Sequence, residues 1–171
     1  MKKLYTRNGD DGYTGLLGEG RVPKYNLRTE TVGTLDEASA VLGIARSTCK
    51  SNQISFWVRE IQKDLYHIMA EVSATEDNAE RFRVIDHDKV IWIEERIDEL
   101  SEQVSLPNGF ILPGDTVSGA YFSLSRTVIR RAERLVARLV HEEKISNREV
   151  LRYLNRLSSL CFMFEIIENA A

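Results

Sequence analysis

Long stretches of amphipathic helical pattern constrain the fold of this chain more than any other feature. Apolar residues recur at spacings of three and four in five segments, and each spacing places them on one face of a helix. The three prolines all fall outside these segments. Five helices with short connections pack as a bundle. We therefore predict an all-α five-helix bundle, with helices over about 28–48, 54–72, 86–104, 116–143 and 147–168.

Capping and turn residues support these helix boundaries. Asp86 and Asn147 are suited to cap the third and fifth helices. Asn108 with Gly109 would end the third helix, and residues 112–115 would turn the chain into the fourth. The polar and charged residues 75–83 are predicted to form a mobile loop.

Length and charge narrow the functional classes. The 171 residues fit one domain, 1–171, and 23 basic against 26 acidic residues give a net charge of −3. Such a chain has no overall attraction to nucleic acid or to an anionic membrane, so any anion site must be local. We expect no membrane span and no secretory signal, and hence a cytoplasmic protein. Cys49 and Cys161 are predicted to be buried, reduced thiols.

A glycine-rich N-terminal loop precedes the first predicted helix. Residues 5–15, YTRNGDDGYTG, combine glycines with hydroxyl groups and an arginine. Backbone N–H groups in such a loop can form an anion-binding nest, to which Thr6 and Thr14 would add hydroxyl donors. Arg7 and Lys24 would add positive charge. The alternative is a turn-rich arm without a ligand.

The fourth predicted helix carries a row of arginines. Arg126, Arg130 and Arg134 are spaced four apart and share one helix face, with Glu133 beside them. Guanidinium groups bind phosphate or carboxylate oxygens in bidentate pairs, so this face is a candidate triphosphate site. The alternative is a solvated charged face.

Five segments, in this order, resemble the PduO-type ATP:cob(I)alamin adenosyltransferases. They are YTRNGDDGYT (5–14), VGTLDE (32–37), FILPG (110–114), SRTVIRRAER (125–134) and YLNRLS (153–158). The resemblance covers about 4–169. Three positions depart from the family pattern: Ser123 replaces a histidine, Asp115 a glycine and Ser159 an aspartate.

The resemblance implies a homotrimer with active sites between adjacent subunits, ATP with Mg²⁺, and cob(I)alamin as the second substrate. Cobalt would attack the 5′-carbon of ATP and expel triphosphate, and a cobalamin-dependent acceptor enzyme would be a further partner. Mg²⁺ would be held through the ATP phosphates rather than by protein side chains. The implied catalytic residues are Arg126, Arg130 and Asp36, with Asp36 pairing across the interface with Arg126. The implied ATP contacts are Thr6, Arg7, Asn8, Gly9, Thr14, Gly15, Lys24, Arg130, Glu133 and Asn155, and the implied corrinoid contact is Phe110.

Two other functions stay open at this point. The three departures would also suit a non-catalytic family member that binds ATP and serves as a cobalamin chaperone or regulatory subunit. A plain trimeric bundle with a charged face would bind no ATP.

Overall fold

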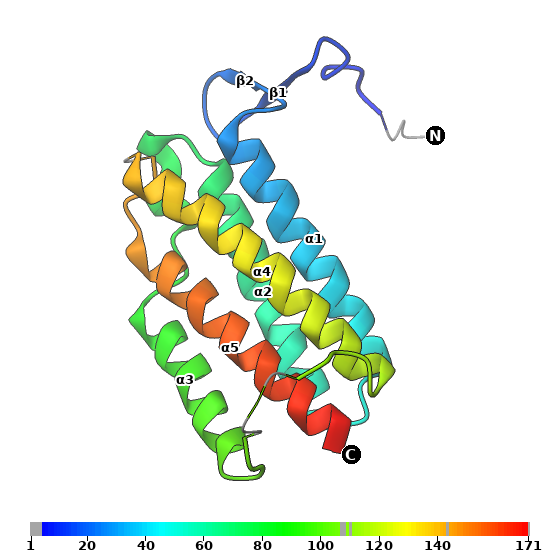
Figure 1. Cartoon of the computed structure of the whole chain (residues 1–171). Coiled ribbons are helices and arrows are strands. Elements are labelled where there is room, and N and C mark those ends of the chain that lie inside the picture. The colour runs from blue at the N-terminus through cyan, green and yellow to red at the C-terminus, as the bar shows by residue number, and fades with distance from the viewer. Residues whose placement is uncertain (1–4, 107–108, 110, 143, 171) are drawn as a thin grey trace.

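The computed structural model describes residues 5–106, 109, 111–142 and 144–170, and within them the body of the protein consists of five α-helices (Figure 1). α1 packs against α2 and α4, α4 lies along α5, and α3 lies against α5. The predicted mainly helical fold is confirmed. The helices are α1 (Leu27–Thr48), α2 (Asn52–Ser73), α3 (His87–Ser101), α4 (Val117–His141) and α5 (Arg148–Ala170).

Side-chain caps set the ends of these helices. Asp86 Oδ1 accepts from the N–H of Lys89 at 3.0 Å, and Asn147 Oδ1 accepts from the N–H of Glu149 at 3.1 Å, so both predicted caps are confirmed. α2 begins two residues earlier than predicted because the Ser51 hydroxyl accepts from the N–H of Ile54. α3 ends at Ser101 rather than near residue 104.

The apolar stripes of the helices meet in one core. Phe122 of α4 and Phe164 of α5 are fully buried, with ring centroids 5.1 Å apart. Tyr153 is also fully buried, and its hydroxyl donates to Asp64 at 2.9 Å. The other oxygen of Asp64 accepts from Lys89 at 2.7 Å, so this buried carboxylate is paired and hydrogen-bonded.

The segment 75–83, predicted to be a mobile loop, contains a short helix. η1 (Glu76–Phe82) is a 3₁₀-helix that follows α2 directly. The N–H of Asn78 donates to Thr75 O at 3.0 Å, and the N–H of Arg83 donates to Glu80 O at 3.3 Å. These i to i+3 bonds satisfy the backbone locally, which a polar sequence permits without an apolar stripe.

The N-terminal segment contains a hairpin that the sequence did not predict. β1 (Tyr13–Gly15) pairs antiparallel with β2 (Arg21–Pro23). Between the strands, the N–H of Leu17 donates to Ser73 O at 2.8 Å, and Leu17 O accepts from the N–H of Thr75 at 3.1 Å. The hairpin is thus fastened to the end of α2, beyond the start of α1, and the chain before it extends away from the bundle (Figure 1).

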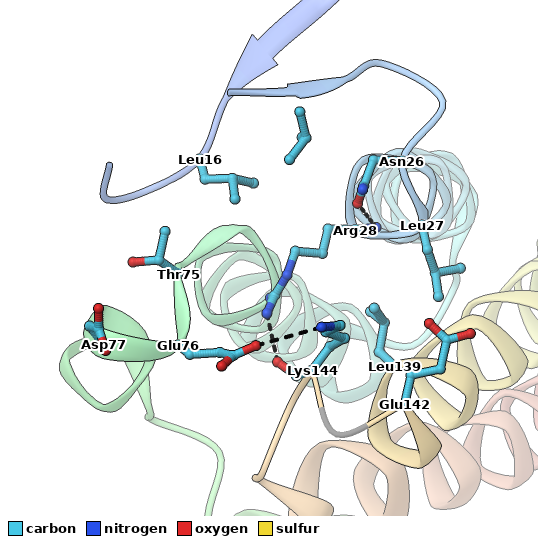
Figure 2. A pocket seen from close by; sticks show the side chains of 11 residues that line it. Leu16, Asn26, Leu27, Arg28, Thr75, Glu76, Asp77, Leu139, Glu142 and Lys144 are labelled. Carbon is cyan, nitrogen blue, oxygen red and sulfur yellow. Dashed lines mark hydrogen bonds and ion pairs between the residues drawn. The ribbon is translucent and has the colours of Figure 1, made fainter. Parts of the chain in front are cut away.

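Arg28 joins three segments at the hairpin end of the bundle. Its guanidinium is buried and donates to Val72 O at 2.8 Å. It also donates to Lys144 O at 2.6 Å (Figure 2). It lies in a cavity of about 450 Å³ beneath the hairpin, which Leu139 and Glu142 at the end of α4 also line. Arg28 therefore ties the start of α1 to the end of α2 and to the α4–α5 connection.

Glu168 plays the same part at the opposite end. It is fully buried and accepts from the hydroxyl of Ser118 at 2.7 Å, the backbone N–H groups of Lys50 and Ser51 at 3.0 and 3.2 Å, and the thiol of Cys49 at 2.9 Å. Both cysteines are free, but only Cys161 is fully buried, while Cys49 is half-buried. Burial and the Glu168 contact raise the pKa of Cys49 to about 12.

In the described parts of the chain, no helix is both long enough and apolar enough to cross a membrane.

Candidate active site

A cavity of about 360 Å³ opens between the first half of α4 and the second half of α5. α4 contributes Arg126 and Arg130, which face it together because they are one helical turn apart. α5 contributes hydroxyl, aromatic and carboxyl groups. The lining residues are Gly109, Ile111, Ser123, Arg126, Arg130, Ser158, Ser159, Phe162 and Glu165.

The two arginines differ in their surroundings. Arg126 is half-buried, and its Nε is buried without a hydrogen-bond partner among the described residues. Arg130 is exposed. Buried N–H groups in proteins are nearly always paired, so this guanidinium nitrogen beside the cavity has bonding capacity that the described residues do not use.

Glu165 gives the floor of this cavity a buried carboxyl group. Burial raises its pKa, an effect that hydrogen bonding from Ser123 and the charge of Arg126 oppose and that Asp115 reinforces. All three departures from the family pattern act here, because Ser123 and Ser159 line the cavity and Asp115 acts on Glu165.

A network of polar side chains joins α4, α5 and α3 beside the arginines. Asn155 Nδ2 donates to Glu133 at 2.8 Å, so two predicted ATP contacts lie together. Asn155 Oδ1 accepts from Arg156 at 2.7 Å, and Arg156 pairs with Glu94 at 2.9 Å. This network fixes Glu133 and Asn155 relative to the helix backbones.

The predicted N-terminal contacts lie on the hairpin and the turns before it. Arg7 (φ 63°) and Gly12 (φ 82°) adopt left-handed backbone conformations, and two turns close between them, from the N–H of Asp10 to Arg7 O and from the N–H of Gly12 to Gly9 O. Lys24 folds over Gly9, where its Nζ lies 3.0 Å from the position a Cβ would take. Thr6, Asn8 and Gly15 are exposed, and Thr14 is partly buried.

One chain does not bring these two groups of predicted residues together. The hairpin lies over the end of α4, near Leu139. Arg130 and Arg126 are 9 and 13 residues earlier on that helix, which corresponds to about 14 and 20 Å at a rise of 1.5 Å per residue. The turns before β1 also point away from the bundle (Figure 1).

Asp36 is exposed on α1, and no ion pair joins it to Arg126 within the described residues. Its neighbour Glu37 pairs instead with Arg131 of α4. The pairing of Asp36 with an arginine of another subunit stays a prediction. Phe110, the predicted corrinoid contact, lies outside the described residues.

Comparison with known proteins decides the family. A family model described as cobalamin adenosyltransferase matches residues 4–168. The chain belongs to this family. The resemblance drawn from the five sequence segments is confirmed.

Relatives match over nearly the whole chain. The corrinoid adenosyltransferase of Bacillus subtilis (strain 168) is 34% identical over 172 residues, covering 98% of this chain and 87% of that protein. The corrinoid adenosyltransferase PduO of Citrobacter freundii is 38% identical over 161 residues, which are 93% of this chain and 48% of PduO.

Solved structures of the family share the fold. A variant PduO-type ATP:corrinoid adenosyltransferase from Lactobacillus reuteri, complexed with cobalamin and ATP, superposes with a TM-score of 0.88 at 33% identity and covers 98% of this chain and 90% of that one. A second variant from the same organism, complexed with ATP, gives 0.89 at 32% identity, covering 98% and 94%.

Sequence reasoning missed several residues of this cobalamin adenosyltransferase's cavity. Phe162 and Glu165 follow Asn155 by 7 and 10 residues, so they continue its helix face. Extending that face would have found both. The sequence did not indicate a role for Arg21, which binds the N-terminal turns, because only the hairpin brings it close to them.

Proposed function

We propose that this chain is an ATP:corrinoid adenosyltransferase, which transfers the 5′-deoxyadenosyl group of ATP to the Co(I) centre of a corrinoid. A cobalt–carbon bond forms as the C5′–O bond breaks, and the bonding electron pair leaves with triphosphate. One observation carries the proposal: Arg126 and Arg130 line a single cavity in a chain that matches the family along residues 4–168.

The arginines act on the leaving group. Triphosphate gains negative charge as the C5′–O bond breaks, and preformed guanidinium donors stabilise that charge in the transition state. The substrate cobalt is the nucleophile, so the protein supplies positioning and charge rather than a general base. The buried Nε of Arg126, which lacks a partner among the described residues, supports this role.

The active site lies between adjacent subunits of a homotrimer. One subunit wraps the triphosphate with Thr6, Arg7, Asn8, Gly9, Thr14, Gly15 and Lys24. Its neighbour binds the triphosphate with Arg130, and its Glu133 and Asn155 contact the nucleoside end of ATP or the helix arginines. Asp36 pairs with Arg126 across that interface. Within one chain, Leu139 beneath the hairpin and the two arginines are about 14 to 20 Å apart along α4, which supports this assembly.

Mg²⁺ enters with ATP. Its preferred ligands are oxygens, and it commonly binds through substrate phosphates. Within the described ranges, no three His, Cys, Asp or Glu side chains gather in a way that could hold a metal ion. In this proposal the ATP phosphates carry Mg²⁺, with the N-terminal loop around them.

Phe110 contacts the corrin ring. Its neighbours Gly109 and Ile111 both line the arginine cavity, as does Phe162 of α5. This apolar side of the cavity suits a flat macrocycle and keeps water from cobalt.

The chain forms one domain, 1–171, and it works in the cytoplasm, for which the two free thiols are suited.

One assay tests the proposal. The protein is mixed with MgATP and chemically reduced cobalamin, and the corrinoid spectrum is followed, with protein-free and Arg130→Ala reactions as controls. We expect adenosylcobalamin only with the unmodified protein. ATP binding without turnover would favour the non-catalytic chaperone, and a protein that binds no ATP would be the plain bundle.

A further inference from the structure

Arg21 of β2 is the centre of the N-terminal turns. Its two terminal nitrogens each lie 2.8 Å from an oxygen of Asp11, which makes a bidentate pair. Nη2 also donates to the backbone oxygens of Asn8 at 2.5 Å and Tyr13 at 3.2 Å. One side chain thus binds three points of the segment that precedes it.

Asp11 completes the arrangement. Its Oδ1 also accepts from the N–H of Tyr13 at 3.1 Å, so it caps the turn that leads into β1. Hydrogen bonding to Arg21 and to the backbone lowers the pKa of Asp11. The aspartate is charged at neutral pH and holds Arg21 over the Tyr13 ring, 5.8 Å from its centroid.

Besides Arg21, these turns are held by hydrogen bonds within the segment and by Lys24, whose N–H donates to Gly12 O at 2.9 Å. Residues 5–8 are exposed, and the chain there points away from the bundle. Arg7 adopts a left-handed conformation that is uncommon for a residue with a side chain, so its neighbours must hold it there. One of the two carbonyl groups that Arg21 binds belongs to Asn8, the residue that follows Arg7.

We propose that Arg21 and Asp11 form a clamp that holds residues 7–13 in the shape that receives the triphosphate. Arg21 is then a positioning residue for ATP, and this inference rests on the proposed function. The clamp includes Arg21, which lies outside the segment 5–14 that resembles the family.

Direct contact between Arg21 and phosphate is the competing role, and Asp11→Asn separates the two. If Arg21 bound phosphate itself, removing the Asp11 charge would release Arg21 and bring less repulsion, so ATP would bind more tightly. If the pair is a clamp, the loop loses its shape and ATP binds more weakly. The two roles therefore predict opposite signs.

The experiment measures the dissociation constant of MgATP by calorimetry, together with kcat and the KM values for ATP and corrinoid. For Asp11→Asn and Arg21→Lys we expect ATP affinity to fall about threefold to fivefold, as loss of a solvent-exposed ion pair would give. We expect kcat and the corrinoid KM to change less than about twofold, since neither group touches the reacting atoms. The double variant should be no weaker than the worse single variant.

Glu19→Gln is the matched control. Glu19 is exposed in the same hairpin. Its substitution by Gln removes the same charge as Asp11→Asn does, without changing Arg21 or Asp11. Its ATP affinity should equal or slightly exceed that of the unmodified protein. Unchanged or tighter ATP binding by Asp11→Asn would overturn the clamp.

Hydrogen exchange tests the clamp independently of the chemistry. In Arg21→Lys without ligand, amides of residues 8–15 should exchange at least about fivefold faster, while those of α1–α5 keep their rates. Equal exchange in both proteins would overturn the clamp even if the enzyme is active. A protein that makes no adenosylcobalamin but shows faster exchange would retain the clamp and lose the proposed function.

Discussion

The charged side chains of this protein fall into two groups at the scale of single residues. Some are buried and fully paired, as Asp64 is with Lys89 and Tyr153. Others line a cavity, as Arg126 and Arg130 do, and the buried Nε of Arg126 has no partner among the described residues. The first group stabilises the fold and the second is available to a ligand, so replacement of each should affect a different measurement.

Replacing Arg130 should weaken ATP binding. In Arg130→Ala we expect the ATP affinity to fall about 10- to 100-fold, since a hydrogen bond to a charged group contributes about 1.5–3 kcal/mol. The ATP affinity of Arg130→Lys should lie between those of the unmodified protein and Arg130→Ala, because lysine keeps the charge but lacks the planar guanidinium group. Calorimetry with MgATP gives both values. Arg152→Ala, an exposed arginine paired with Glu149 on α5, should bind ATP normally. Full affinity in Arg130→Ala would remove this residue from the site.

Glu71 should make stability depend on pH. It is buried, Asn147 donates to it at 3.1 Å, and the Nε of Arg83 lies 3.7 Å away. Burial raises its pKa above the ordinary value of 4.5, although Asn147 and Arg83 oppose this. A raised carboxyl pKa means that the folded state holds the proton more tightly. Its contribution to stability is therefore complete below pH 4.5 and is lost as the pH rises through the raised pKa.

Glu71→Gln keeps the acceptor for Asn147 and has no charge to bury. The free energy of unfolding of the variant should exceed that of the unmodified protein near neutral pH, and the two should converge toward pH 4.5. Denaturant unfolding across this range measures the difference. Glu95→Gln, at an exposed position on α3, should show no such divergence. A variant less stable at neutral pH would contradict the assignment.

At the scale of helices and strands, buried polar groups fasten the ends of the bundle. Arg28 binds carbonyl groups at the hairpin end, and Glu168 binds N–H and O–H groups at the other. Both complete backbone groups that helix ends leave unpaired. These two side chains hold the short connections between α1 and α2 and between α4 and α5.

Removing the Glu168 charge should destabilise the end of the bundle opposite the hairpin. Burial would raise its pKa, but hydrogen bonds from Cys49, Lys50 and Ser118 outweigh it, so the pKa lies below 4.5. The resulting stability is present above pH 4.5 and is lost as the pH falls through the lowered pKa. Glu168→Gln should lower the free energy of unfolding by about 2 kcal/mol at neutral pH. The gap should narrow in acid, and a constant gap would point to packing instead. Thermal unfolding at several pH values distinguishes the two.

Periodicity and caps predicted the helices because burial of an apolar stripe leaves a regular trace in sequence. They did not predict β1 and β2, which have three residues each and too few apolar positions for an alternating pattern. Helix spacing placed Arg126 and Arg130 together, and the structure bears this out. It could not find Glu71, Glu165 or Glu168, since a buried acid looks like a surface acid until its donors are known.

At the scale of the whole molecule, the proposed site needs more than one chain. Asp36→Asn should lower kcat/KM for ATP about tenfold or more, because it removes the partner of Arg126 at the interface. Light scattering should also show less trimer at low protein concentration. Asp98→Asn, exposed on α3, is the control. A fully active, fully trimeric Asp36→Asn would contradict the interface role.

Mixed trimers test the shared site directly. Arg7→Ala and Arg130→Ala should each be nearly inactive, one through its loop and the other through its helix. When both are co-expressed, about a quarter of the interfaces in a randomly mixed ring combine an intact loop with an intact helix. Adenosylcobalamin formation should return to about that fraction. A site within one chain would give no recovery.

The burial of Cys49 and its hydrogen bond to Glu168 also affect how the protein can be labelled. With a pKa of about 12, Cys49 is ionised in roughly one molecule in ten thousand at pH 8, and the thiolate is the form that reacts with maleimides and iodoacetamides. Cys161 is fully buried, which raises its pKa as well. Both native thiols should stay silent toward such reagents. A single cysteine introduced at position 19 would then carry a fluorophore alone, and could report the movement of the hairpin as ATP arrives.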